Sequence, residues 1–174
     1  MTFYSGFSLQ QEEGFFADYH DRGDFCIAGF SLGAIKAFEY TLACKSRIDK
    51  LQLFSPAFFQ ESKESFKKVQ LRHFQKDRKS YIKNFLTNCA YPSAVDLQSY
   101  YHDSPDEELQ KLLYYVWEPE KLKTLVTRGI MIEVYLGEKD KIIDSQKAEI
   151  FFKAFTSTNM MKNRGHILQK EENG

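Results

Sequence analysis

Short apolar stretches that end at small or turn-forming residues recur along the chain and predict β-strands. They cover residues 1–5, 24–30, 51–54, 130–136 and 159–161. Between them lie stretches with helical spacing of apolar residues, at 15–22, 32–43 and 145–155. Strands that alternate with helices predict an α/β fold, in which a mostly parallel sheet is covered on both faces.

Residues 58–128 interrupt this alternation. They contain no strand pattern and show two helical patterns, over 62–88 and 106–127. A helical block of this size between two strands predicts a cap inserted into the core rather than a second domain. We therefore expect an α/β core formed by residues 1–57 and 129–174.

Composition narrows the class of protein. With 174 residues, of which 43% are hydrophobic and 28% charged, the chain is expected to form one globular domain with a substantial core. Basic and acidic residues balance at 24 each, so net charge gives no reason to expect nucleic acid or a membrane surface as partner. Neither a secretory signal nor an apolar run of about 18 residues is visible. The three cysteines, Cys26, Cys44 and Cys89, lack metal-binding spacing and favour reduced thiols in a cytoplasmic protein.

Residues 29–33, Gly-Phe-Ser-Leu-Gly, match the pattern G-x-S-x-G between a predicted strand and a predicted helix. A nucleophilic serine needs a tight strand-to-helix turn, and small residues two before and two after keep neighbouring chains clear of it. Ser31 is therefore the candidate nucleophile. The alternative is an inert serine in a glycine-lined structural turn.

A serine hydroxyl needs a base, and in folds with this turn the order along the chain is serine, acid, histidine. His166 follows the last predicted strand and fits this order, whereas His20 precedes the serine and the other two histidines lie in the predicted cap. The acid is expected after the strand at 130–136. Asp140 is the first choice, with Asp144 and Glu138 as rivals.

An oxyanion hole requires two backbone N–H donors. One is expected from Leu32, directly after the serine, and the other from the loop after the first strand, where Phe7 is the candidate.

The cap also carries a basic stretch that either docks an acidic protein or forms an ordinary solvated helix face. Its docking candidates are Lys67, Lys68, Arg72, Lys76, Arg78 and Lys79. No metal-ligand set or phosphate-binding loop is found, so no cofactor is expected.

With these residues in place, the chain resembles the α/β-hydrolase family over nearly its full length. More closely, it resembles the compact pimeloyl-[acyl-carrier protein] methyl ester esterases of biotin synthesis. The matching segments are residues 3–7, 28–37, 53–56, 74–77 and 165–166.

The resemblance implies hydrolysis of the methyl ester of pimeloyl-[acyl-carrier protein], with release of methanol through an acyl-enzyme on Ser31. Acyl carrier proteins are acidic, so the basic cap helix would be the docking face. The acyl channel is expected to be lined by Phe7 and Phe30 together with cap aromatics. These are Tyr114, Tyr115 and Trp117.

The chain departs from the usual family pattern at its start. It begins at the strand that carries the oxyanion loop, so the usual first two strands are missing and about six are expected. Ser5 and Gly6 stand where a His-Gly pair is common. Two other functions remain open: a generalist carboxylesterase or acyl thioesterase, and a non-catalytic binding protein on a hydrolase scaffold.

Overall fold

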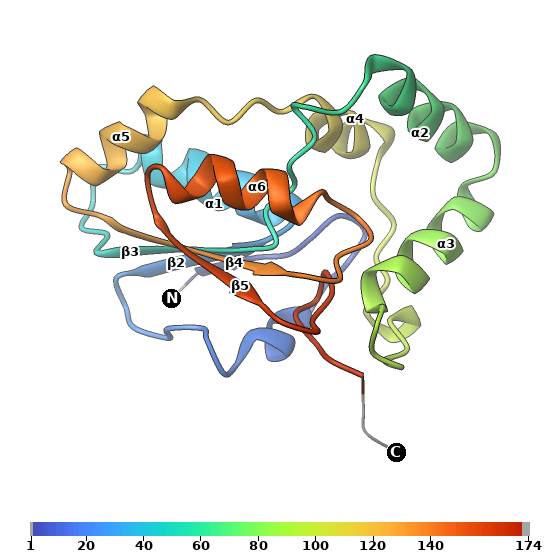
Figure 1. The fold of residues 1–174 in the computed structure, drawn as a ribbon, viewed down its shortest axis with the longest axis horizontal. Coiled ribbons are helices and arrows are strands. Elements are labelled where there is room, and N and C mark those ends of the chain that lie inside the picture. Colours follow the sequence, from blue (N-terminus) through green and yellow to red (C-terminus); the bar gives the residue numbers. More distant parts are fainter. Residues whose placement is uncertain (1, 172–174) are drawn as a thin grey trace.

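The central sheet has five strands, all parallel and in sequential order (Figure 1). The structure is a computed structural model that describes residues 2–171. The strands are β1 (Thr2–Tyr4), β2 (Cys26–Phe30), β3 (Lys50–Phe54), β4 (Met131–Gly137) and β5 (Ser157–Met161). This arrangement confirms the expected α/β fold with a parallel sheet.

The register brings the carboxyl ends of the central strands level with one another. Phe30, the last residue of β2, pairs with Phe54, the last of β3, and Phe54 pairs with Tyr135 of β4. In parallel sheets, ligand sites form in the crevice outside these ends. The loops after β2, β3 and β4 therefore meet at one edge of the sheet.

Helices α1 (Leu32–Ala43), α5 (Pro119–Thr127) and α6 (Ser145–Lys153) cover one face of the sheet (Figure 1). The opposite face is covered by the 3-10 helix η1 (Glu12–Phe16) and the chain that follows it. The ring of Phe16 stacks on Phe54 at 4.6 Å between centroids and lies 5.0 Å from Phe30. The helix expected at 15–22 is therefore an earlier and shorter 3-10 turn.

The expectation of about six strands was wrong for the described residues, which contain five. Each observed strand overlaps one of the five apolar stretches of the sequence, so the local pattern predicted the number of strands and the family pattern overestimated it. The chain between β1 and β2 forms a loop and the η1 cover. Met1 and residues 172–174, which belong to the expected core ranges, lie outside the described residues.

The cap forms around α2 (Glu64–Lys76), α3 (Arg78–Ala90), the 3-10 helix η2 (Gln98–Tyr100) and α4 (Asp106–Tyr114). Each of the two expected long helices is broken into two. Asp77 ends α2 and starts α3, because its side chain accepts a hydrogen bond from the Ser80 amide at 3.0 Å. The second pattern breaks before Pro119, which takes the first position of α5.

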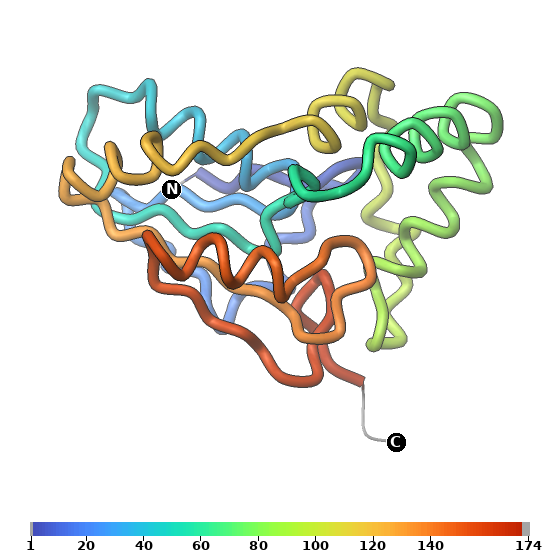
Figure 2. The backbone as a smooth tube through the Cα atoms, turned by 45° about the horizontal axis from the view of Figure 1, so that its top comes forward, coloured from blue at the N-terminus to red at the C-terminus, as the bar shows by residue number. Residues whose placement is uncertain are grey.

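Helix α5 lies within the range expected for the cap, yet it packs on α1 and β4 and lies far from α2 and α3 (Figures 1 and 2). The Arg128 guanidinium, just after α5, donates to the carbonyl oxygens of Thr41, Leu42 and Cys44 at the end of α1. These bonds satisfy helix-end carbonyls that have no partner within the helix.

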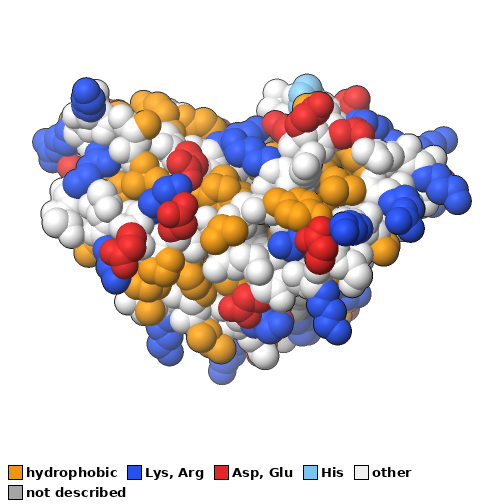
Figure 3. All heavy atoms as spheres, turned by 90° about the horizontal axis from the view of Figure 1, so that it is seen from above, with side chains coloured by type: hydrophobic (Ala, Val, Ile, Leu, Met, Phe, Trp, Pro, Cys, Tyr) orange, Lys and Arg blue, Asp and Glu red, His pale blue; other side chains and the backbone are white. Residues whose placement is uncertain are grey.

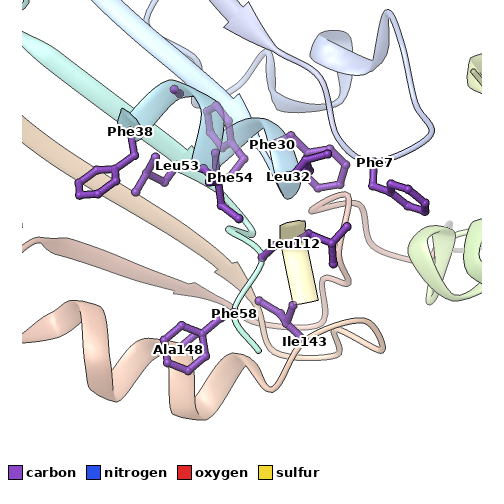
Figure 4. Close-up of a cluster of buried hydrophobic side chains, with 14 of the residues drawn as sticks. Phe7, Phe30, Leu32, Phe38, Leu53, Phe54, Phe58, Leu112, Ile143 and Ala148 are labelled. Atoms are coloured by element: carbon purple, nitrogen blue, oxygen red, sulfur yellow. The ribbon is translucent and has the colours of Figure 1, made fainter. Parts of the chain in front are cut away.

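One continuous apolar core joins the sheet, the helical layer and the cap. Figure 4 shows side chains from β2, β3 and α1 together with Leu112 of α4 and Ile143 of the loop after β4. Burying such aliphatic and aromatic side chains stabilises the fold by about 1.5–3 kcal/mol each.

Cys26 and Cys89 are buried as free thiols, and Cys44 is half-buried. None of the helices in residues 2–171 has the length and apolar character needed to cross a membrane.

Candidate active site

Ser31 occupies the sharp turn between β2 and α1. Its backbone has φ 53° and ψ −113°, a conformation that residues with a side chain rarely adopt. The Ser31 carbonyl accepts hydrogen bonds from the amides of Ala34 and Ala57. The strained turn is thus held by the start of α1 and by the loop after β3, and this geometry fits the nucleophile turn expected from the sequence.

The two glycines of the G-x-S-x-G pattern are required by close approach of backbone atoms. A Cβ on Gly29 would collide with the carbonyl of Gly33, and a Cβ on Gly33 would collide with the carbonyl of Tyr4. The first turn of α1 therefore passes directly over the end of β1, which only a glycine at position 33 permits.

The three residues selected for acyl chemistry form a continuous hydrogen-bonded line. The Nε2 atom of His166 lies 3.1 Å from the Ser31 Oγ, and its Nδ1 atom lies 2.6 Å from the Asp140 Oδ2. The side chains of His166 and Asp140 are both fully shielded from solvent. A carboxylate at Nδ1 places the ring proton there, which leaves the Nε2 lone pair free to accept the serine proton.

The loop after β4 separates Asp140 from its two rivals. The other carboxylate oxygen of Asp140 accepts from the amides of Ile142 and Ile143, which fixes the side chain toward His166. Asp144 caps α6 by accepting from the Lys147 amide at 3.1 Å. Glu138 is exposed and accepts from the amide of Asn163. Of the three carboxylates, only Asp140 hydrogen-bonds the His166 ring within the described residues.

Ser55 was not selected from the sequence, although it helps to place the histidine. Its hydroxyl donates to the backbone carbonyl of His166 at 2.6 Å, from a residue that itself has φ 40°. The loop that carries His166 also packs tightly, because a Cβ on Gly165 would collide with the Tyr91 carbonyl. The sequence offered one signal for this role of Ser55. It directly follows β3, in the pair Ser55-Pro56, and therefore lies at the edge of the sheet where the site forms.

The two amides expected to form an oxyanion hole come from the loop after β1 and from the start of α1. Within residues 2–171, neither the Phe7 amide nor the Leu32 amide donates a hydrogen bond, so both remain available to a ligand. The amide of Gly6 donates to Glu12 at 2.7 Å, and the amide of Ser8 donates to the Ser104 hydroxyl at 3.1 Å. Burial raises the pKa of Glu12, against the opposing effect of the hydrogen bond from the Gly6 amide.

A cavity of about 260 Å³ opens beside Ser31 under the cap. The apolar part of its wall comes from Phe7, Phe59, Phe66, Phe85, Ile142 and three leucines of α4. The polar part comes from Gln70, His73, Tyr81, Asn84, Asn88 and Lys141. The volume lies just below the range of sites for drug-sized ligands, and it suits a short acyl group.

Most of the residues expected to line an acyl channel do not line this cavity, and Phe7 is the exception. Trp117 is fully buried, with its ring 5.0 Å from that of Phe38 and its Nε1 donating to the Ala57 carbonyl. Tyr115 hydrogen-bonds Glu39, and Tyr114 hydrogen-bonds Glu64 on the surface. Phe30 packs behind the ring of His166. These four aromatics therefore support the structure around the site.

The six basic docking candidates fall into two groups. Lys68, Arg72, Lys76 and Lys79 are exposed on α2 and α3, at the end of the molecule where Figure 3 shows many Lys and Arg side chains. Lys67 is buried, with its Nζ 5.0 Å from the centre of the Tyr114 ring. Arg78 is held by Asp103, Asp106 and the carbonyl of Ser104.

Among residues 2–171, no group of three His, Cys, Asp or Glu side chains is arranged to hold a metal ion. A serine with a buried histidine base and two free amides can attack a carbonyl carbon and stabilise the resulting oxyanion.

The sheet, the Ser31 turn and the inserted cap together define the α/β-hydrolase fold. The structure is similar to naproxen esterase (carboxylesterase NP) from Bacillus subtilis, with a TM-score of 0.63 and 16% identity over 96% of this chain and 76% of that one. It is similar to MenH from S. aureus, with a TM-score of 0.61 and 13% identity over 97% and 87% of the two chains.

A third similar structure is carboxylesterase CesB (YbfK) from Bacillus subtilis, with a TM-score of 0.54 and 19% identity over 82% of this chain. The match covers 53% of CesB, so the chain spans about half of that enzyme's length. No protein-family model and no curated protein sequence matches the chain.

Proposed function

We propose that the protein is a serine hydrolase of carboxylic esters, with Ser31 as nucleophile, His166 as general base and Asp140 as the residue that orients the histidine. The observation that carries the proposal is the hydrogen-bonded line from Asp140 through His166 to the Ser31 Oγ, with distances of 2.6 and 3.1 Å. The similarity of the fold to carboxylesterases supports the same reaction class.

In this mechanism, His166 removes the Ser31 proton while the Oγ attacks the ester carbonyl. The oxyanion is stabilised by the amides of Leu32 and Phe7, and the protonated His166 then gives its proton to the departing alcohol. Water, activated by the same histidine, attacks the acyl-enzyme, breaks its ester bond to Ser31 and releases the carboxylic acid.

The substitution Ser31→Ala tests the proposal. We expect turnover of short p-nitrophenyl esters to fall by several orders of magnitude, up to about 10⁶-fold, and covalent labelling by a fluorophosphonate to disappear. Ser46→Ala is the matched control, because Ser46 is exposed in the loop after α1 at the other end of the sheet. Unchanged hydrolysis by Ser31→Ala would overturn the assignment. Absent labelling of the parent protein would favour a binding protein on a hydrolase scaffold.

For the substrate, we propose the methyl ester of pimeloyl-[acyl-carrier protein], which is cleaved to methanol in biotin synthesis. Two features support this proposal: the resemblance of the segments around Ser31 and the exposed basic side chains Lys68, Arg72, Lys76 and Lys79. A cluster of like charge attracts an acidic carrier and raises its association rate. Lys67 and Arg78 are already engaged within the cap and contribute less to such a surface.

A generalist carboxylesterase is the second candidate, favoured by the similarity to naproxen esterase and CesB. Parallel assays with methyl pimeloyl-carrier protein and with free methyl esters distinguish the two. A strong preference for the carrier-bound ester that weakens with added salt supports the specific enzyme. Equal rates on both substrates support the generalist. Growth of a biotin auxotroph that lacks its own pimeloyl ester esterase tests the specific role in cells.

A further inference from the structure

The cavity beside Ser31 has a polar wall without negative charge. Two helix faces supply most of it: Gln70 and His73 lie one turn apart on α2, and Asn84 and Asn88 lie one turn apart on α3. Lys141 completes this wall from the loop after Asp140. No Asp or Glu lines the cavity within the described part of the chain, so its electrostatic character is neutral to positive.

These polar side chains have unused hydrogen-bonding capacity. Within residues 2–171, the side chains of Gln70, His73, Asn84 and Asn88 make no hydrogen bond to protein atoms, and Lys141 has no carboxylate within ion-pair distance. The side chains of Ser31, His166 and Asp140 contrast with this, because each of them is hydrogen-bonded. Unbonded donors in the wall of a substrate cavity favour a ligand that brings acceptors.

Lys141 occupies a defined place at one end of this wall. Its Nζ lies 3.4 Å from the centre of the ring of Tyr91, which directly follows α3 and stands three positions after Asn88. The ring faces one side of the ammonium group, whose N–H donors remain free for another partner. Lys141 and Asn88 thus line the same cavity as Ser31, and the ammonium is held at the end of α3.

We propose that Lys141, assisted by Asn88, recognises an anionic group on the acyl side of the ester, either on the acyl chain itself or on an arm attached to it, while the ester carbonyl lies at Ser31. This inference rests on the proposed esterase function and specifies its substrate class. Two kinds of substrate bring this chemistry: a free monoester of a dicarboxylic acid, through its terminal carboxylate, and a carrier-linked acyl chain, through the phosphodiester of its prosthetic arm.

The test compares pairs of esters that differ only in charge. One pair is monomethyl pimelate and the analogue whose free carboxylate is replaced by a carboxamide. The other is the methyl ester of pimeloyl phosphopantetheine and the same compound without its phosphate. The variant is Lys141→Met, which keeps the aliphatic stem, and Lys141→Arg should restore the charge.

We expect the parent protein to prefer the anionic member of one pair by about 10-fold or more in kcat/KM, since hydrogen bonds to charged groups have this strength. Lys141→Met should abolish the preference through a higher KM and leave the neutral ester unaffected. Lys139→Met is the matched control, because Lys139 lies in the same loop but borders a different surface hollow with Asn163 and Lys170.

The outcomes separate the two proposals. A preference in the first pair identifies a dicarboxylic monoester, and a preference in the second identifies a carrier arm. Neutral esters that are hydrolysed as well as anionic ones by the parent, or a preference that survives in Lys141→Met, would overturn the role of Lys141 and leave the esterase function intact. Failure to cleave any of the four esters, together with absent fluorophosphonate labelling of Ser31, would instead remove the proposed function.

Discussion

The cavity has a strand-end side, with Ser31, Asp140 and His166, and a cap side, with the polar residues of α2 and α3. The two sides hold their polar groups in opposite ways. On the strand-end side, Asp140 is fixed by two backbone amides, His166 by Asp140 and by Ser55 at its own carbonyl, and Ser31 by the backbone at its turn. On the cap side, Asn84 and Asn88 line the cavity, and their side-chain amides have no protein partner in the described residues.

This difference indicates a division of tasks. Groups that must meet a transition state need fixed geometry, since a displacement of about 1 Å can lower a rate by about 100-fold. Groups that select a substrate can keep their hydrogen bonds free until the substrate arrives. We therefore expect changes on the strand-end side to affect kcat, and changes on the cap side to affect KM and substrate preference.

The largest effect within this comparison is expected from Asp140→Asn. An amide cannot hold His166 in the tautomer that accepts the serine proton, so kcat should fall by about 10⁴-fold with little change in KM. Steady-state kinetics with a short p-nitrophenyl ester measures this. Asp144→Asn is the control, because asparagine also caps a helix and Asp144 caps α6. If Asp144→Asn lost as much activity as Asp140→Asn, the assignment of the acid would be wrong.

Arg78 provides an intermediate case, because it joins the cap to the loop after β1. Its guanidinium donates to the Ser104 carbonyl at 2.7 Å, and the Ser104 hydroxyl accepts from the amide of Ser8, next to Phe7. We expect Arg78→Met to lower kcat on a small free ester by about 10-fold, with KM nearly unchanged, by loosening the oxyanion loop. Ser104→Ala should have a similar effect.

The exposed neighbour Lys79 supplies the control, since Lys79→Met leaves this chain of hydrogen bonds intact. The result also decides between two roles for Arg78. A residue that docks a carrier would affect only carrier-bound substrate, whereas a residue that positions the loop affects every ester. Normal kinetics of Arg78→Met on free esters would contradict the positioning role.

The same contrast explains how far the sequence could predict the molecule. The strands, the Ser31 turn and the positions of Asp140 and His166 follow from local patterns, because apolar runs and their ends fix which residues stand at the edge of a parallel sheet. The break at Asp77 was also visible locally, as an aspartate three residues before a serine at the start of an apolar pattern, but apolar spacing alone extends across it.

The cavity wall could not be predicted in this way. Trp117, Tyr114 and Tyr115 were selected because aromatics suit a pocket, yet the direction in which a cap side chain points depends on how the cap helices pack. Lys141 and Asn88 are far apart in the sequence and line the same cavity because α3 ends beside the loop after β4. One local signal was available: Tyr81, Asn84, Phe85 and Asn88 share one face of α3.

The smallest effect is expected from a buried polar side chain that lies away from the cavity and lacks hydrogen-bond partners. His20 is buried between the rings of Phe3 and Phe54, and neither ring nitrogen has a hydrogen-bond partner in the described residues. Burial lowers the pKa of His20 below its ordinary value. Below about pH 6.5, the unfolded chain therefore binds a proton that the folded protein does not, and the free energy of unfolding should decrease as the pH falls toward the folded pKa.

Urea unfolding at pH 7.5 and pH 5.5 measures this effect in the parent protein and in His20→Phe, where a similar ring fills the site. The variant should lose less stability between the two pH values, by at most about 1.4 kcal/mol, because pH 5.5 lies about one unit below the ordinary pKa of histidine. His102→Phe is the control, because His102 is exposed. Because His20 lies away from the cavity, esterase kinetics at neutral pH should be unchanged. An identical pH dependence in both proteins would mean that His20 is hydrated in the folded state. The difference between hydrogen-bonded and unbonded polar groups would then apply only to the cavity.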